Sequence, residues 1–326
     1  MAVTASAGGE GRPASAAALS SAGLLPNFLI LGAQKSGTTA LFYALSKHPE
    51  VFTSPVKEPR FFANEAKALG DAAGPGDGET RMTSSLEEYE ALFADAGAAV
   101  ARGEASPAYL YDAEAPQKIA ALIPDAKLIA ILRNPVERAY SNFLYLVREG
   151  REPLHDFGAA LDAEAERRAS GWSTNWLYRD KGFYGAQLER YLEHFDRDRI
   201  HCILYEDYNE DPEPTVRDVY RFLGVDEGFS QDLSIRLNVS GLPKSKGLQA
   251  LSNRSRRLKW LIEPLVPDRV RRGLLKAQNK NLSRPPLPPQ VRASLIEEYR
   301  EDVERVRELT GLDVSGWLET GSKPAA

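Results

Sequence analysis

The chain is organised around the segment Asn27-Phe-Leu-Ile-Leu-Gly-Ala-Gln-Lys-Ser-Gly-Thr-Thr39. Its first part, Phe28 to Leu31, is a continuous apolar run, the pattern of a strand buried on both faces. A glycine-bounded loop starts at Gly32, and Thr38 to Ser46 has the apolar spacing of a helix. This order predicts an anion site, because free backbone N–H groups and the positive end of the helix dipole converge on the loop.

The loop is close to a Walker A phosphate-binding loop but lacks its lysine. That motif, G-x-x-x-x-G-K-[ST], has Lys directly after the second glycine. Gly32 and Gly37 keep the spacing, but Thr38 and Thr39 come next. The lysine of this loop is Lys35, whose ammonium can meet charge that develops on a bridging oxygen. The alternative, a glycine-rich turn without a ligand, is disfavoured because strand, spacing, paired threonines and helix all coincide.

A second strand end carries an arginine. Leu128 to Leu132 is another buried apolar run, and Arg133 follows it directly. Asn134 can cap a helix whose first position is Pro135. In an open parallel sheet, ligands bind beyond the carboxyl ends of the strands. We therefore expect Arg133 and the loop after Gly32 to face one pocket.

Two side chains near this second strand end suit a phosphate. The planar guanidinium of Arg133 matches a phosphate, and Ser141 on the following helix offers a hydroxyl to the same anion. Arg138 lies one turn before Ser141 and is the competing candidate. The alternative role for Arg133 is an ion pair at the end of a strand.

A carboxylate lies in an unusual local setting at Lys57-Glu-Pro-Arg-Phe-Phe62. Glu58 stands between two cations, just before an aromatic pair that can anchor the segment. With an ordinary pKa of about 4.3, Glu58 is ionised at neutral pH and can accept a proton from a hydroxyl. The pattern fits a general base and a surface salt bridge equally well, since structural ion pairs produce the same spacing.

The remaining chain alternates strands and helices. Apolar runs at 51–53, 98–101 and 199–205 indicate strands, and helical patterns occupy 86–93, 155–170, 181–195, 211–223 and 290–309. The alternation predicts an α/β fold, a P-loop-like three-layer sandwich with a central parallel sheet and helices on both faces. We expect a single domain at 27–318, a disordered N-terminal arm at 1–26 and a C-terminal tail at 319–326.

Composition argues against several classes of protein. The 326 residues carry a net charge of −5, with a pI near 5.6, which disfavours a dedicated nucleic-acid binder. The only cysteine, Cys202, permits no internal disulfide, and four scattered histidines give no metal cluster. No segment approaches the roughly twenty apolar residues of a membrane span. These features predict a soluble cytoplasmic protein without stable membrane insertion or a required metal.

Further segments are distinctive in composition. Residues 64–85, rich in Gly, Pro, Asp and Ser, indicate a loop or lid. The small residues of 103–109 either let the backbone approach a ligand or make an ordinary turn. Residues 238–247, with two lysines, suit closure over an anion. The basic segment 254–276 suggests a solvated helical face more than contact with an acidic surface. The aromatic residues between 172 and 178 are expected in the core.

Together these motifs resemble those of the sulfotransferases that use 3′-phosphoadenosine-5′-phosphosulfate (PAPS), and within them the soluble bacterial branch related to the glycan-modifying, heparan-type enzymes. The resemblance covers most of 27–318 and rests mainly on Gly32–Thr39 and Arg133–Ser141. Two departures stand out. Glycan sulfotransferases often have a lysine where Ala105 stands, and they often carry a C-terminal disulfide, which this chain lacks.

The resemblance implies a site and a reaction. It implies in-line transfer of a sulfonate group from PAPS to a hydroxyl or amine of a small-molecule or saccharide acceptor, with PAP as product and no metal. Glu58 would be the general base, and Lys35 would neutralise the oxygen between sulfur and phosphorus. The implied PAPS contacts are Lys35, Ser36, Gly37, Thr38 and Thr39, with Arg133 and Ser141 at the 3′-phosphate.

Two other functions stay open. A P-loop phosphotransferase needs a lysine where Thr38 stands, and an acidic Mg²⁺ ligand at a strand end, which Glu206 or Asp207 can supply. The other is a non-catalytic module that senses PAPS or its product. The presence of both Glu58 and Lys35 weighs against that module.

Overall fold

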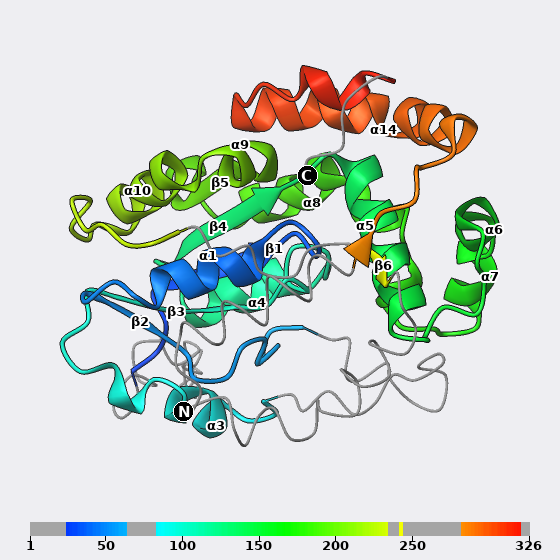
Figure 1. Cartoon of the computed structure of the whole chain (residues 1–326). Coiled ribbons are helices and arrows are strands. Elements are labelled where there is room, and N and C mark those ends of the chain that lie inside the picture. The colour runs from blue at the N-terminus through cyan, green and yellow to red at the C-terminus, as the bar shows by residue number, and fades with distance from the viewer. Residues whose placement is uncertain (1–23, 64–82, 234–240, 244–281, 321–326) are drawn as a thin grey trace, which may run out of the picture.

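The structure is a computed structural model that describes residues 24–63, 83–233, 241–243 and 282–320 (Figure 1). Several expectations fall wholly or largely outside these ranges and are not described: the N-terminal arm, the lid at 64–85, the anion-closing segment at 238–247, the basic segment at 254–276 and most of the C-terminal tail.

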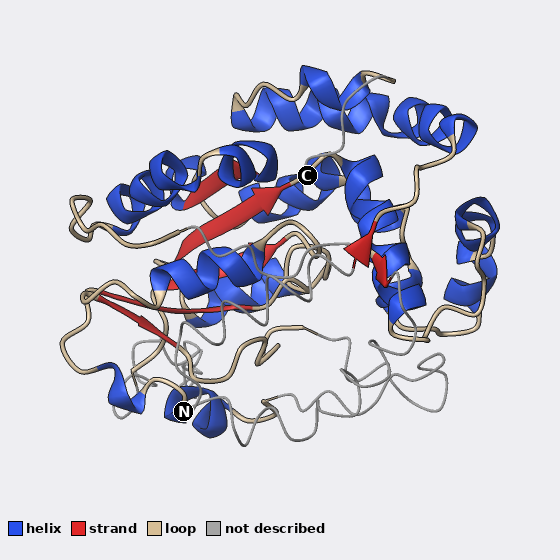
Figure 2. Cartoon of the chain, in the orientation of Figure 1, coloured by secondary structure: helices blue, strands red, loops and turns tan. Residues whose placement is uncertain are grey.

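A five-stranded parallel sheet forms the centre of the molecule (Figure 2). Its strands are β1 (Phe28–Gly32), β2 (Val51–Thr53), β3 (Ala101–Ala105), β4 (Lys127–Leu132) and β5 (Ile200–Leu204). Their order across the sheet is β2-β3-β1-β4-β5. Because all neighbouring strands are parallel, their carboxyl ends share one edge. The segments that follow β1 and β4 therefore leave the sheet side by side.

The central strands are buried on both faces, as their apolar runs predict. Every residue of β1 is buried, and the register pairs Leu29 with Leu128 of β4. Successive side chains of a strand point to opposite faces. Phe28 and Ile30 therefore enter one core cluster, while Leu29 and Leu31 enter the other. A strand with two apolar environments needs an apolar residue at every position.

Helices cover both faces of the sheet (Figure 1). One face packs on α1 (Thr38–Leu45) and α10 (Pro212–Leu223), with α9 (Tyr205–Glu210) just before α10. The other packs on α4 (Ala115–Leu122), α5 (Pro135–Arg148), α8 (Tyr184–Leu192) and α14 (Pro289–Thr310). Shorter elements are α3 (Leu86–Ala91), α6 (Phe157–Asp162), α7 (Glu164–Ala169), the antiparallel pair β6 (Leu242–Pro243) and β7 (Leu282–Ser283), and 3-10 turns at Ala94–Ala96, Thr174–Trp176, Asp180–Gly182, Arg197–Arg199 and Ser315–Leu318. The predicted three-layer α/β fold is confirmed.

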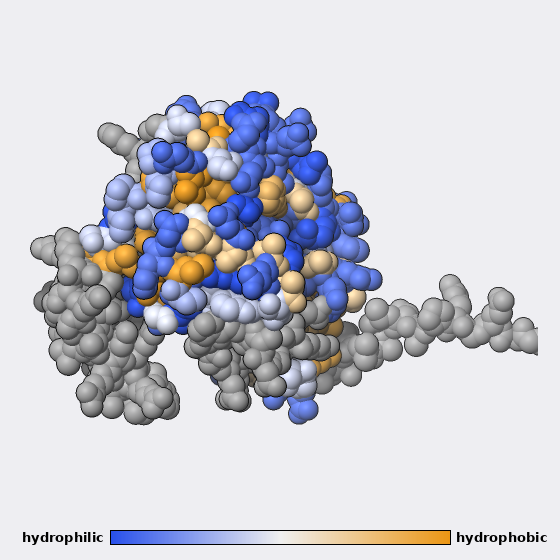
Figure 3. All heavy atoms as spheres, turned by 90° about the vertical axis from the view of Figure 1, so that its right-hand side faces the viewer, coloured by the Kyte–Doolittle hydropathy of each residue, from blue (hydrophilic) through white to orange (hydrophobic). Residues whose placement is uncertain are grey.

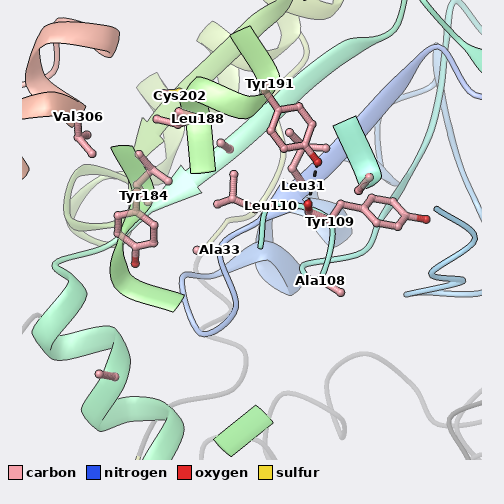
Figure 4. Close-up of a cluster of buried hydrophobic side chains, with 14 of the residues drawn as sticks. Leu31, Ala33, Ala108, Tyr109, Leu110, Tyr184, Leu188, Tyr191, Cys202 and Val306 are labelled. Atoms are coloured by element: carbon pink, nitrogen blue, oxygen red, sulfur yellow. Dashed lines mark hydrogen bonds between the residues drawn. The ribbon is translucent and has the colours of Figure 1, made fainter. Parts of the chain in front are cut away.

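The larger core extends to the carboxyl edge of the sheet. Figure 4 shows Leu31 of β1 near Leu110, Tyr109 and Tyr191, all in the same core cluster. The Tyr191 hydroxyl donates a hydrogen bond to the carbonyl oxygen of Tyr109 at 2.8 Å. This bond ties α8 to the segment that follows β3. Apolar packing thus continues directly beneath the loops at this edge.

The last helix packs its apolar side against α8. Residues Leu295, Tyr299, Val303 and Val306 are buried on α14, as the sequence pattern predicts. Asp302 is also buried, and its carboxylate accepts hydrogen bonds from the first backbone N–H groups of α8, at 2.8 and 3.0 Å. Figure 3 views the side of the molecule that lies at the right of Figure 1. Hydrophilic side chains cover much of this side, with hydrophobic areas among them. Within the described ranges, no helix is long and apolar enough to cross a membrane.

Two elements differ from their predicted positions. β3 begins at Ala101, where a strand was expected to end, so Gly103 lies within the sheet. A Cβ at Gly103 would lie 2.4 Å from the Phe28 carbonyl oxygen, so the close approach of β1 explains this glycine. The helix predicted at 155–170 is broken at Ala163 into α6 and α7. After the break, Arg167 of α7 makes two hydrogen bonds to buried Glu152, at 2.7 and 2.9 Å.

Candidate functional site

The loop after β1 presents backbone N–H groups at the carboxyl edge. Gly37 is the N-cap of α1 and has a φ of +91°, a left-handed conformation that favours glycine. A Cβ at Gly37 would also lie 3.1 Å from the ring of Tyr205. In the described structure no side chain caps α1 and its first turn contains no acidic residue. The amides at the start of α1 are therefore available to an anion.

Lys35 lies in the middle of this loop in an electropositive setting. Its ammonium is 4.0 Å from the centroid of the Tyr145 ring. Burial lowers the pKa of Lys35 to about 7, assisted by the charges of Arg148 and Arg133, while Glu149 and Glu58 act in the opposite direction. A bound anion would offset this desolvation and repulsion. The surroundings of Lys35 thus favour a negatively charged ligand.

Arg133 joins the two strand ends. Its Nη1 donates a hydrogen bond to the carbonyl oxygen of Lys35 at 3.1 Å, and its guanidinium lies 4.5 Å from the centroid of the Tyr205 ring. The side chain is buried, and among the described residues its Nε has no hydrogen-bond partner. Asn134 caps α5 as predicted, accepting hydrogen bonds from the N–H groups of Val136 and Glu137. The structure therefore brings Arg133 and the glycine-rich loop together.

The other predicted anion ligands lie around these two. Ser36 and Thr38 are buried, and Thr39 is half-buried in the first turn of α1. The hydroxyls of Ser36 and Tyr184 are buried beside each other, and neither makes a hydrogen bond of good geometry within the described ranges. A buried hydroxyl without a partner is costly, so Ser36 fits a ligand-binding role.

The two candidates on α5 are both buried. Ser141 is fully buried, one turn after Arg138. Arg138 donates a hydrogen bond to the carbonyl oxygen of Tyr178, so part of its guanidinium is engaged within the protein. Its Nε and Nη1 have no partner among the described residues. Arg133, unlike Arg138, touches the loop itself.

Glu58 lies on a segment held against the end of β3. We call residues 57–62 the Glu58 segment. The N–H of Glu58 donates to the carbonyl oxygen of Ala105 at 3.1 Å, and its carboxylate pairs with Lys57 and, at 3.0 Å, with Arg60. Burial raises the pKa of Glu58, but the charges of Lys57 and Arg60 outweigh it and hold that pKa below its ordinary value. Its side chain is 31% exposed, so an ionised carboxylate is open to a proton donor.

Two residues of this region were not singled out from the sequence. Tyr205, the first residue of α9, lies against both Gly37 and Arg133. Glu104 is fully buried behind the Glu58 segment, where burial raises its pKa to about 7. No sequence signal pointed to Glu104, because the strand predicted at 98–101 ends before it.

Glu206 and Asp207, the acidic residues that a phosphotransferase could use for Mg²⁺, are not arranged as metal ligands in the described structure. Glu206 accepts a hydrogen bond from the backbone N–H of Asn134 at 2.9 Å, and Asp207 is exposed. Among the residues with described positions, no three His, Cys, Asp or Glu side chains cluster as metal ligands. Glu206 therefore supports the turn between β4 and α5.

The chain is similar to several known proteins. A crystal structure of a sulfotransferase from Alicyclobacillus acidocaldarius is 31% identical in sequence, covers 91% of this chain and 100% of its own, and superimposes with a TM-score of 0.71. The mouse bifunctional heparan sulfate N-deacetylase/N-sulfotransferase 4 is 30% identical over 215 residues, which are 62% of this chain and 22% of that protein.

A second mouse relative is heparan sulfate glucosamine 3-O-sulfotransferase 3B1. It is 29% identical over 201 residues, which are 62% of this chain and 46% of that protein. The matched part therefore spans less than half of the length of either mouse protein. The model of the family described as "Sulfotransferase family" matches residues 26–230. This chain belongs to the sulfotransferase family.

Proposed function

We propose that this chain transfers a sulfonate group from PAPS to a hydroxyl or amine, and that the acceptor is a saccharide. The observation that carries the proposal is the meeting of Lys35 and Arg133 at adjacent strand ends, with Glu58 within electrostatic range of Lys35. Two cations suit a ligand with two anionic groups, and a nearby ionised carboxylate suits a proton acceptor.

The chain offers a set of groups that fits such a nucleotide. The phosphosulfate end would be held by Lys35, Ser36, Gly37, Thr38 and Thr39, and the 3′-phosphate by Arg133 and Ser141. Two features favour an anionic ligand: the Ser36 hydroxyl and the Arg133 Nε are buried, and neither makes a hydrogen bond of good geometry with another described residue. When bound, PAPS supplies an activated sulfonate group, with PAP as its leaving group.

The proposed chemistry of the protein is a proton transfer and a charge neutralisation. Glu58 accepts the proton of the attacking hydroxyl or amine, and its partial exposure lets it return that proton to solvent. Lys57 and Arg60 keep Glu58 ionised at neutral pH. The ammonium of Lys35 faces the negative charge that develops on the departing oxygen, which is worth on the order of 3 kcal/mol in an occluded site.

A saccharide acceptor is supported by two lines of reasoning. Both mouse relatives are named for heparan sulfate, a saccharide polymer. In addition, the surroundings of Glu58 are basic, because Lys57 and Arg60 pair with it and the charge of Arg60 acts on Arg151 of the loop after α5. Such surroundings favour an acceptor that carries negative groups near its reactive hydroxyl or amine. The cytoplasmic location and the independence from metal stay predictions.

Transfer of label from ³⁵S-PAPS tests the proposal. The acceptors are N-deacetylated heparosan oligosaccharides, N-sulfated heparan oligosaccharides, 4-nitrophenol and a simple primary alcohol. We expect label on a saccharide and PAP in equal amount, and loss of both when Lys35 or Glu58 is replaced by Ala. Full activity in both variants would overturn the proposed roles. Tight PAP binding without transfer to any acceptor would favour a sensor, and transfer from γ-³²P-ATP a phosphotransferase.

A further inference from the structure

Three hydroxyl groups surround the buried carboxylate of Glu104. Ser106 donates to its Oε2 at 2.8 Å and Tyr89, from α3, to its Oε1 at 3.4 Å. The Tyr109 hydroxyl also hydrogen-bonds to Glu104. A carboxylate is an acceptor only, so a hydroxyl bonded to it donates its proton and keeps its lone pairs for other donors. Ser106 and Tyr109 are also within hydrogen-bond contact of each other, so the three groups form one network.

Two of these hydroxyls face the Glu58 segment. The backbone N–H of Arg60 donates to Ser106 Oγ at 3.1 Å, and that of Phe62 reaches the Tyr109 hydroxyl at 3.5 Å. The segment also packs on the same group of residues, since the Phe61 ring stacks on Tyr89 with centroids 4.3 Å apart. The backbone amides of Arg60 and Phe62 are thus bonded to the hydroxyls of Ser106 and Tyr109, and Glu104 orients these two hydroxyls.

The Glu58 segment needs such an anchor because its backbone is strained. Glu58 has a φ of +60° and Arg60 a φ of +55°, left-handed values that cost non-glycine residues free energy. A conformation of this kind persists only where the surroundings hold it. Arg60 is held at its N–H by Ser106 and in turn pairs with the Glu58 carboxylate at 3.0 Å.

We propose that Glu104 is a positioning residue for sulfonate transfer: through Ser106 and Tyr109 it holds the backbone of the Glu58 segment so that Glu58 faces the acceptor. This inference rests on the proposed function of Glu58, but its structural part concerns the segment alone. Glu104 touches neither nucleotide nor acceptor in this account, and acts only through the two hydroxyls.

The network works only with an ionised Glu104. A protonated carboxyl donates its own proton to the oxygen of one of the surrounding hydroxyls. That proton then competes with the backbone N–H of Arg60 or Phe62 for the same hydroxyl oxygen. The charged and titratable groups that act with Glu104 are Tyr89 of α3, Tyr109, Glu58 and, from α8, Tyr191. Burial raises the pKa of Glu104 to about 7, so the anchor weakens as the pH falls through neutrality.

Hydrogen exchange of the segment tests the inference without any acceptor. In the full chain, we expect Glu104→Gln to speed the exchange of the Arg60 and Phe62 amides about tenfold or more, because an amide side chain donates where the carboxylate accepts. Ser106→Ala should release Arg60 alone, and Tyr109→Phe should release Phe62 alone. These two variants keep the test decisive if Glu104→Gln does not fold.

Turnover supplies the functional readout. At saturating PAPS, Glu104→Gln and Ser106→Ala should lower kcat about tenfold or more, while the Kd for PAP stays within about twofold. In the wild type, kcat should fall as the pH drops below 7, at a pH well above the pKa of Glu58. The pH–rate profile of Glu104→Gln should lack this acidic fall. The matched control is Glu164→Gln, a carboxyl on α7 whose pKa burial also raises to about 7 but which binds the N–H of Arg179.

The outcomes separate this inference from the proposed function. If the wild type transfers sulfonate but Glu104→Gln and Ser106→Ala match it in kcat and exchange, the positioning role is wrong. If Glu164→Gln has the same effects as Glu104→Gln, the effect is general destabilisation and the role is also wrong. If the wild type transfers no sulfonate, the proposed function fails, and the exchange pattern alone decides whether Glu104 anchors the segment.

Discussion

Arg133 Nη1 lies 3.1 Å from the carbonyl oxygen of Lys35 and donates a hydrogen bond to it across 98 positions of the chain. The bond links the segments that follow β1 and β4, the two adjacent strands at the centre of the sheet. The same guanidinium that holds the glycine-rich loop is, in the proposed function, the one that binds the 3′-phosphate of the nucleotide.

Replacing Arg133 by Lys should weaken PAP binding. Lysine keeps the charge but cannot hydrogen-bond the loop carbonyl and a phosphate with one rigid fork. We expect a loss of about 1.5–3 kcal/mol, the usual value of a hydrogen bond to a charged group, measured by calorimetric titration with PAP. Arg199→Lys is the matched control, because Arg199 bonds the carbonyl oxygen of Asp125 and the site does not include it. Equal affinities for wild type and Arg133→Lys would remove Arg133 from the nucleotide site.

Replacing Lys35 by Met should act mainly on the transition state. Methionine fills a similar volume without the ammonium that faces the departing oxygen. Loss of one such group commonly lowers kcat by about 10²–10³. Single-turnover transfer from ³⁵S-PAPS measures this change, with near-ultraviolet circular dichroism as the control for the fold. A kcat within a factor of two of wild type would contradict the role.

The affinity for PAP should depend on pH through Lys35. The pKa of Lys35 is lowered to about 7 by burial and by Arg148 and Arg133, and the protonated form is the one that attracts an anion. Affinity should therefore be highest near pH 7 and fall by up to about tenfold per unit above it, since a phosphate monoester with a second pKa near 6 is already ionised there. Binding should take up a proton, measurable by titration calorimetry in buffers of different ionisation enthalpy. Lys35→Met should show neither effect.

Replacing Glu58 by Gln should separate catalysis from binding. The amide keeps the shape of the side chain but cannot accept the proton, which typically costs about 10²–10⁴ in rate. PAP affinity should change little, because the ion pairs of Glu58 are with Lys57 and Arg60, and its charge acts on the pKa of Lys35 less than those of Arg148 and Arg133 do. The measurements are kcat for transfer and Kd for PAP. A large loss of PAP affinity with an unchanged kcat would point to a structural role.

The parts of the site that follow local rules were predictable from the sequence. β1, its loop and α1 are consecutive, and Asn134 and Pro135 mark the start of α5 by capping chemistry alone. Because parallel strands share one carboxyl edge, the meeting of Arg133 and the loop after Gly32 was predicted too. The order of the strands across the sheet was not.

The parts that depend on distant contacts were not predictable. Helix α4 (Ala115–Leu122) is short, and its apolar residues give little helical periodicity in the sequence. Ile119 is buried because the helix packs on the sheet. Tyr205 enters the site because the chain turns directly from β5 into α9. Glu104 lies beyond the strand predicted at 98–101, and its three hydroxyl partners come from residues 89, 106 and 109, which only the fold brings together.

The contacts made by the Asp302 carboxylate limit where the chain can be truncated. It supplies acceptors to the amides of Gly185 and Ala186, while the ring of Tyr299 occupies the space next to Gly182. Both acceptor and ring come from α14, beyond the part matched by the family model, which ends at residue 230. A fragment that ends at residue 230 would lack the acceptors for the amides at the start of α8, and would expose to water the side of α8 that packs on α14. The start of α8, which lies within the range that the family model matches, thus depends on a helix outside that range.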